Sequence, residues 1–210
     1  MLPLVLQAYE NPCGVNYVPF PTNDPTTWTC IDQEVANANS MQYLAENLPS
    51  FDEINKCSLG FCPDTDSGIA SFATDFALGV KGRYSWAASV PEDIYLEYVV
   101  PYANVNEGRN NIRPLLNDAC TAIFEDVAQQ DLDKMTISDA ALLINSKLWS
   151  GNPVLGKTIV FKSSQTPLIY DPMSTLAFGY ASCTGVSIFF VDALRSVGIP
   201  ARIAGTPAWN

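Results

Sequence analysis

The sequence of 210 residues contains no histidine. Histidine is the side chain that most often moves protons at neutral pH, both as a general base and as a general acid. A cysteine nucleophile needs such a group to take its proton and, later, to protonate the leaving group. These residues therefore cannot by themselves form a complete cysteine–histidine catalytic pair.

Basic residues are also scarce, with 11 Lys and Arg against 22 Asp and Glu and a net charge of −11. Nucleic acids and anionic membranes both require a basic surface, so we expect neither as a partner. No apolar run approaches the roughly 20 residues of a membrane span, and we expect none. Charged residues make up only 16% of the chain. A surface that depends on Asn, Ser and Thr favours a secreted or cell-surface protein over a cytosolic one.

Apolar residues are plentiful, at 48% of the sequence, which is enough for a substantial core in one large domain. They recur at helical spacing through most of the chain, so the pattern predicts one mainly helical unit. The expected helices cover residues 32–48, 67–81, 91–100, 112–129, 136–149 and 183–197, the expected strands cover 158–162 and 199–204, and residues 9–30, 49–66 and 165–181 are expected to be loops.

The six cysteines of the chain fall into two groups. Cys120 lies on an apolar helical face and Cys183 at a helix start, and we expect both to be unpaired. The other four lie in loop-like sequence, where a zinc site is one alternative, although their spacing fits a paired Cys-x-x-Cys ribbon poorly. Four cysteines allow three disulfide connectivities, and any of them would imply an oxidising, extracellular compartment. The pairing that we expect is Cys13 with Cys30 and Cys57 with Cys62.

The surroundings of Cys183 predict a cysteine at the start of a buried helix. Ser182 is a good N-cap, because its hydroxyl can accept a hydrogen bond from a free backbone N–H of the first turn. Those N–H groups and the positive end of the helix dipole favour an anion at the first helical position, so a thiolate there should be stabilised and nucleophilic. Gly198 supplies a left-handed stop, and Pro200 prevents the helix from continuing. An inert, core-packed cysteine is the alternative.

The sequence Cys183-Thr-Gly-Val-Ser187, followed by Ala193-Leu-Arg-Ser-Val-Gly-Ile-Pro-Ala-Arg202, resembles the core motif of the transglutaminase-like superfamily. A second block, from Trp86 through Glu97-Tyr-Val-Val-Pro-Tyr102 to Arg113, is similar to the helical region before the core in a bacterial-type branch. Together the two blocks extend the resemblance over about residues 70 to 210.

The resemblance implies a predominantly helical α+β fold, in which a helical N-terminal region precedes the first half of a papain-like core. We expect residues 1–66 to form a cysteine-containing arm and helix, residues 67–157 a helical region, and residues 158–210 the start of the core with the Cys183 helix.

The family also implies acyl transfer or amide hydrolysis, in which Cys183 attacks a protein or peptide amide and forms a thioester. The family's catalytic histidine and aspartate lie on two strands that follow this motif. We therefore expect a missing or separate C-terminal segment, or a companion chain, to supply them. The alternative is a catalytically inactive module with a structural or binding role in a larger extracellular assembly. Neither reading requires a cofactor.

An acyl-transfer site also needs donors that stabilise an oxyanion. The backbone N–H of Cys183 is one candidate. Trp149, Tyr180, Ser174 and Trp209 are further candidates for the oxyanion hole or the substrate cleft, and ordinary packing is the alternative for all four.

The remaining charged residues suggest structural roles. Asp192 lies in the middle of its helix and is not expected to be the triad acid. Arg195 and Arg202 belong to the motif, and we expect a buried ion pair with a carboxylate, rather than catalysis, to explain them. The acidic residues lack the spacing of a metal-binding loop, and no metal site is predicted.

Overall fold

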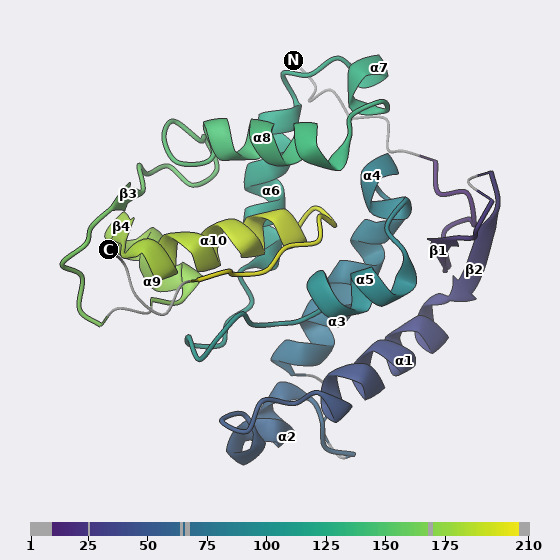
Figure 1. The fold of residues 1–210 in the computed structure, drawn as a ribbon, viewed down its shortest axis with the longest axis horizontal. Helices are drawn as coiled ribbons and strands as arrows, with labels where there is room; N and C mark the ends of the chain where they lie inside the picture. Colours follow the sequence, from purple (N-terminus) through teal and green to yellow (C-terminus); the bar gives the residue numbers. More distant parts are fainter. Residues whose placement is uncertain (1–9, 25, 64, 66–67, 168–169, 206–210) are drawn as a thin grey trace.

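The computed structural model describes residues 10–24, 26–63, 65, 68–167 and 170–205, and it is a helix-dominated α+β fold (Figure 1). Two hydrophobic clusters hold it together, one built mainly from the first half of the chain and the other from the second half. The fold class predicted from the sequence is therefore confirmed.

The first cluster is enclosed by a β-hairpin and by helices that follow it in the sequence. α1 begins where expected, because the side chain of Asp32 caps it by accepting from the backbone N–H of Glu34 at 2.9 Å. A short 3-10 turn, η1 (Glu53–Asn55), comes before α2. The elements are β1 (Tyr17–Pro21), β2 (Trp28–Asp32), α1 (Gln33–Glu46), α2 (Lys56–Leu59), α3 (Ile69–Lys81), α4 (Ser85–Ala88) and α5 (Glu92–Tyr98).

The second cluster surrounds α10, which lies at the centre of its half of the molecule in Figure 1. Thr136 and Asp139 form a capping box that starts α8. The predicted helix over 112–129 is shorter than expected, because α6 ends at Phe124 and a separate turn follows. The elements are α6 (Arg113–Phe124), α7 (Gln129–Leu132), α8 (Ile137–Lys147), β3 (Val160–Phe161), α9 (Pro172–Phe178), β4 (Tyr180–Ala181) and α10 (Cys183–Arg195).

The expected loop over residues 9–30 contains an antiparallel hairpin instead. β1 pairs with β2 from Tyr17 opposite Asp32 to Pro21 opposite Trp28. Val18 and Phe20 are buried against the first cluster. The prolines of β1 hid this strand in the sequence, since proline is tolerated only at sheet edges, and both strands of a two-stranded hairpin are edges.

The expected loop over residues 165–181 was also wrong, because it contains α9 and β4. The side chain of Asp171 caps α9, Pro172 is its first residue, and Gly179 ends it at φ +74°. The proline and glycine that suggested irregular structure are the start and stop signals of a short helix. β4 then pairs in parallel with β3, which lies within the predicted strand 158–162.

The expected strand over residues 199–204 is absent, because these residues pair with no other strand in the described part of the chain. Their backbone is held in other ways. The N–H of Ala201 donates to the carbonyl oxygen of Tyr98 at 3.2 Å, and the carbonyl oxygen of Ala201 accepts from the guanidinium of Arg195.

The cysteine predictions are confirmed. Cys13 is bonded to Cys30 and Cys57 to Cys62, which excludes the four-cysteine zinc site. Cys120 is free and buried, and burial raises the pKa of its thiol to about 12.

Lys81 is fully buried at the end of α3 and links the hairpin to the helices. Its ammonium donates to three backbone carbonyls, those of Ala87, Ala88 and Val90, at 3.0, 3.3 and 2.7 Å. It also lies within 4.6 Å of the ring centroids of Phe20 and Tyr95. Burial lowers the pKa of this ammonium to about 7.

Candidate active site

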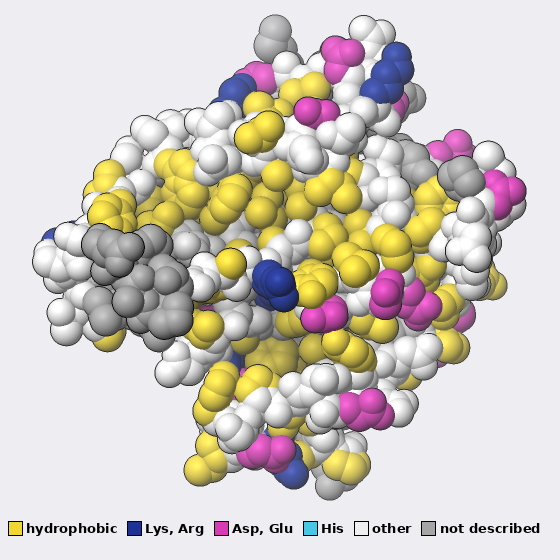
Figure 2. All heavy atoms as spheres, in the orientation of Figure 1, with side chains coloured by type: hydrophobic (Ala, Val, Ile, Leu, Met, Phe, Trp, Pro, Cys, Tyr) yellow, Lys and Arg dark blue, Asp and Glu magenta, His cyan; other side chains and the backbone are white. Residues whose placement is uncertain are grey.

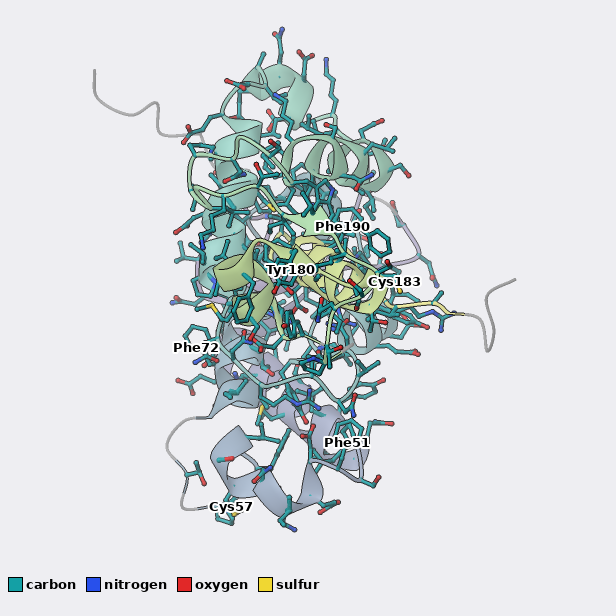
Figure 3. All side chains as sticks on the ribbon, turned by 90° about the vertical axis from the view of Figure 1, so that its left-hand side faces the viewer. Phe51, Cys57, Phe72, Tyr180, Cys183 and Phe190 are labelled. Atoms are coloured by element: carbon teal, nitrogen blue, oxygen red, sulfur yellow. A yellow bond between two sulfur atoms is a disulfide. The ribbon has the colours of Figure 1, made fainter. Side chains whose placement is uncertain are left out.

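Cys183 is the first residue of α10, and its thiol is free and exposed. The hydroxyl of Ser182 accepts from the backbone N–H of Gly185 at 3.3 Å, so the predicted N-cap is present. Figure 3 views the molecule from the side on which α10 begins, and Cys183 lies near its middle. An exposed sulfur beside the free N–H groups of a helix start has the geometry of a nucleophile.

Gln165, which the sequence analysis did not single out, holds the residue before the nucleophile in place. The Gln165 side chain is buried, and its Oε1 accepts from the backbone N–H of Ser182. Its Nε2 donates to the carbonyl oxygen of Pro167 at 2.6 Å. No sequence signal marks this residue, since the loop that carries it becomes adjacent to α10 only through folding.

Gly185 explains why glycine stands two residues after the cysteine in this chain. A Cβ added there would lie 2.8 Å from the Cβ of Ala181 and 3.6 Å from the hydroxyl of Thr175. Glycine therefore lets the first turn of α10 pack directly against β4 and α9. That close approach fixes the position of Cys183 relative to both elements.

Two of the predicted cleft residues lie on elements next to α10. Tyr180 is in β4, three residues before Cys183. Trp149 follows α8 and packs on Phe190, with ring centroids 5.8 Å apart. Phe190 is two turns beyond Cys183 on the same helix face, about 10 Å along the axis. The indole N–H of Trp149 donates to the side-chain oxygen of Asn145 at 3.1 Å, so this donor already has a partner.

Ser174 has a structural explanation, because its hydroxyl donates to the Asp171 carboxylate at 2.6 Å at the start of α9. Trp209 lies outside the described residues. The roles of Trp149, Tyr180 and Trp209 in an oxyanion hole or cleft remain predictions.

The buried ion pair predicted for Arg195 and Arg202 was wrong, because neither guanidinium lies within ion-pair distance of a carboxylate in the described part of the chain. Arg195 is buried and donates to four backbone carbonyls, those of Tyr98, Pro101, Ala103 and Ala201, at 2.9 to 3.2 Å. Arg202 is exposed and lies over the Tyr98 ring at 5.5 Å. Arg195 therefore fastens the end of α10 to the segment after α5.

Asp192 is buried on the far part of α10 and accepts from the Asn104 side chain at 3.0 Å. Burial raises the pKa of Asp192 to about 6, although the nearby guanidinium groups of Arg195 and Arg113 act in the opposite direction. Asp192 lies nine residues, about 13 Å along the helix axis, beyond Cys183. It is a structural group rather than a partner of the sulfur.

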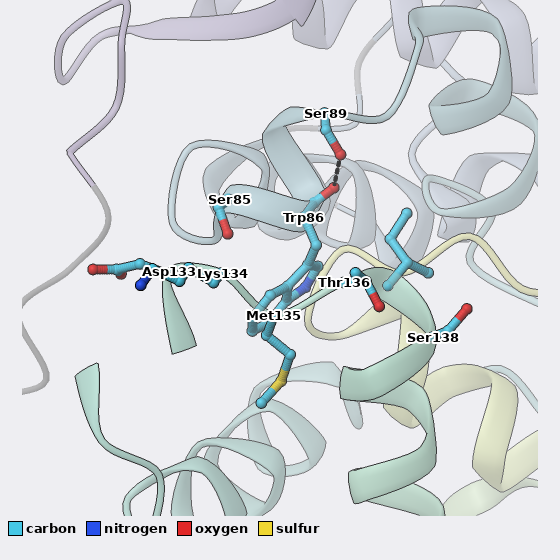
Figure 4. Close-up of a pocket in the computed structure, with 9 residues that line it drawn as sticks. Ser85, Trp86, Ser89, Asp133, Lys134, Met135, Thr136 and Ser138 are labelled. Carbon is cyan, nitrogen blue, oxygen red and sulfur yellow. Dashed lines mark hydrogen bonds between the residues drawn. The ribbon is translucent and has the colours of Figure 1, made fainter. Parts of the chain in front are cut away.

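A cavity of about 420 Å³ opens at the other end of α10, between α4 and the segment joining α7 to α8 (Figure 4). Trp86 lines it and donates from its indole N–H to the carbonyl oxygen of Val197 at 2.8 Å, just past the end of α10. Cys183 begins the same helix about 20 Å away, so this cavity is separate from the candidate nucleophile.

The part of the chain that the structure describes contains no cluster of side chains suited to a metal ion. None of its helices is long and apolar enough to cross a membrane.

The fold and site define a class of protein, a helix-rich α+β chain with a free cysteine at the start of its central buried helix. Residues 136–210 match the family model described as the Transglutaminase-like superfamily. This stretch of the chain is thus transglutaminase-like, which confirms the family resemblance inferred from the Cys183 motif. No curated protein and no solved structure gives a significant match to the chain. The likeness suggested for residues 70–135 lies outside the matched region and remains a prediction.

Proposed function

We propose that this chain carries the nucleophile of a transglutaminase-like cysteine acyltransferase or amide hydrolase acting on protein or peptide amides. The Cys183 thiolate attacks the amide carbonyl, and a tetrahedral intermediate forms. The C–N bond then breaks, the leaving amine takes up the proton that the general base had removed from the Cys183 thiol, and a thioester remains. Water or an amine attacks this thioester, which releases the acyl product and returns the sulfur to its thiolate form.

The observation that carries this proposal is the free, exposed sulfur of Cys183 at the start of α10. Its backbone N–H is suited to donate to the oxyanion of the tetrahedral intermediate. The buried neighbours Gln165 and Gly185 hold that helix start in place, and such precise support is typical of a reacting group.

The proton acceptor must come from outside these 210 residues, because they contain no histidine. We propose that a further C-terminal segment or a companion chain supplies the histidine and the aspartate beside Cys183. The exposed face of α10 offers a place for it, since Ser187 is exposed and Phe190 is only partly buried. Figure 2 supports this choice, because hydrophobic side chains gather on the surface over α10 and between α10 and α8.

The alternative is an inactive module that keeps the fold and serves a structural or protein-binding role. The absence of histidine favours it. The intact cysteine motif and the exposure of the sulfur favour the enzyme. In either case the two disulfides fit an oxidising compartment, and we propose that the protein is secreted or extracellular.

Alkylation with iodoacetamide at pH 5.5 to 6 tests the proposal. We expect Cys183 to be modified at least tenfold faster than free N-acetylcysteine, as a nucleophilic cysteine of an acyl-transfer site should be. Cys120 provides an internal control, since it is buried and should remain unmodified in the folded protein. Peptide mapping by mass spectrometry assigns the modified residue, and Cys183→Ser should abolish the signal.

A Cys183 thiol that reacts no faster than N-acetylcysteine would contradict the enzymatic proposal and favour the inactive module. A second measurement uses everything that co-purifies with the chain. Intact mass and N-terminal sequencing should identify a companion segment or chain that contains histidine, and crosslinks from its histidine-containing peptide should map to α10.

A further inference from the structure

Three aromatic rings form an exposed cluster at the end of the molecule where α10 begins. They belong to Tyr170, Phe178 and Tyr180, and we name them the aromatic platform. Their ring centroids lie 5.5, 5.9 and 6.4 Å apart, within the range of mutual aromatic contact. Phe178 is 57% exposed, and the two tyrosines are partly exposed. An unburied group of three rings is a surface suited to bind an aromatic or apolar group.

The aromatic platform is joined directly to the candidate nucleophile. Tyr180 begins β4, which leads through Ser182 into α10, so Tyr180 and Cys183 are separated by only two residues. Both are labelled in Figure 3, on the side of the molecule that faces the viewer. The parallel pairing of β4 with β3 and the contact of Gly185 with Ala181 fix this segment. The fold therefore fixes the position of the aromatic platform relative to the sulfur.

Charge sets this region apart from the rest of the chain. Residues 148–191 contain two lysines, Lys157 and Lys162, and one acid, Asp171, while the chain as a whole has a net charge of −11. The carboxylate of Asp171 is engaged in capping α9 and also accepts from Asn110 at 2.9 Å. This stretch of sequence, which includes Cys183, is thus slightly positive, whereas the chain as a whole is acidic.

Lys162 places part of this positive charge on the aromatic platform. Its ammonium lies 4.2 Å from the ring centroid of Tyr180, and its side chain is exposed. A cationic ligand would be repelled there, whereas a carboxylate next to an aromatic group could contact Lys162 while its ring contacts the platform.

We propose that the aromatic platform and Lys162 form a substrate subsite for an aromatic side chain that lies next to a carboxylate. This inference rests on the proposed function of Cys183, because the occupant is the acyl donor that the sulfur attacks. The subsite would select donor segments that combine an aromatic residue with an acidic group, and it would discriminate against basic segments.

Affinity-labelling reagents test the subsite, because they alkylate the sulfur of Cys183 directly. The test therefore needs neither the catalytic histidine nor enzymatic turnover. The probes are bromoacetyl-phenylalanine, bromoacetyl-phenylalaninamide and bromoacetyl-glycine, each compared with its rate toward N-acetylcysteine. We expect bromoacetyl-phenylalanine to alkylate Cys183 about three- to tenfold faster than either of the other two, with saturation at high probe concentration. Mass spectrometry of the Cys183 peptide gives the rates.

Two surface variants separate the contributions. Phe178→Ser should remove the preference for phenylalanine over glycine, and Lys162→Gln should remove the preference for the acid over the amide. Phe72→Ser and Lys134→Gln are matched controls on α3 and after α7, and both should behave like the unmodified protein. Circular dichroism confirms that each variant is folded.

The outcomes separate the two proposals. Rapid iodoacetamide alkylation of Cys183 without any preference among the three probes would overturn the subsite and leave the proposed function intact. A preference that persists in both Phe178→Ser and Lys162→Gln would overturn it as well. Slow alkylation by iodoacetamide itself would instead overturn the proposed function, together with the subsite that depends on it.

Discussion

Replacing Gly198 with alanine tests how tightly the end of α10 is packed. Gly198 has φ +75°, and a Cβ added there would lie 2.4 Å from the Cβ of Ala87 and 3.4 Å from Cγ1 of Val80. The substitution therefore combines two costs. A left-handed residue other than glycine costs about 1–2 kcal/mol, and forcing a methyl group into a packed site costs about 1–3 kcal/mol more.

Gly151 is a matched control, because its φ is +73° but nothing lies within 4 Å of an added Cβ. Gly151→Ala should incur only the backbone cost. The change in unfolded-state entropy is the same for both glycines and cancels in the comparison. The difference between the two variants therefore isolates the contact with Ala87.

Urea denaturation followed by circular dichroism measures this difference with the disulfides intact. With a slope of about 2 kcal/mol per molar urea, Gly198→Ala should have a midpoint about 0.5–1.5 M below that of Gly151→Ala. Equal midpoints would refute the reasoning, because they would mean that the end of α10 has room for a methyl group beside α4.

Two further predictions concern Lys81 and the disulfides. Because burial lowers the pKa of Lys81 to about 7, the folded protein binds fewer protons than the unfolded chain above that pH. The free energy of unfolding should therefore gain up to about 1.4 kcal/mol per pH unit between pH 7 and 9. Urea denaturation of both proteins at several pH values checks this, and the unfolding free energy of Lys81→Met should not show the gain. An equal rise with pH in the two proteins would contradict the prediction. Replacing both cysteines of the Cys13–Cys30 disulfide by serine should cost about 3 kcal/mol, against about 2 kcal/mol for Cys57–Cys62, because the first closes the longer loop. Thermal and urea unfolding of the two double variants check this order, and the opposite order would mean that loop closure does not dominate.

The sequence by itself determined the features that depend on neighbouring residues. Ser182 is the N-cap of α10 and Gly198 its left-handed stop, because capping requires only local side chains and local backbone angles. The start of α1, which Asp32 caps, was predictable for the same reason. The pairing of Cys13 with Cys30 and of Cys57 with Cys62 was one of three connectivities that the sequence allowed, and the structure contains it. The transglutaminase-like motif singled out Cys183 as the candidate nucleophile through residue types alone.

Other features were decided only by tertiary structure. The β1–β2 hairpin forms although prolines disfavour its first strand, because Val18 and Phe20 gain burial against helices that come later in the chain. Lys81 is buried because three carbonyls and two rings converge on its ammonium.

The surroundings of Cys183 also belong to this second group. Gln165 becomes a support of α10, and the three rings of the aromatic platform come into contact, only when β3, α9 and β4 come together. Such contacts depend on the complete packing of the chain, and no local pattern of residues encodes them.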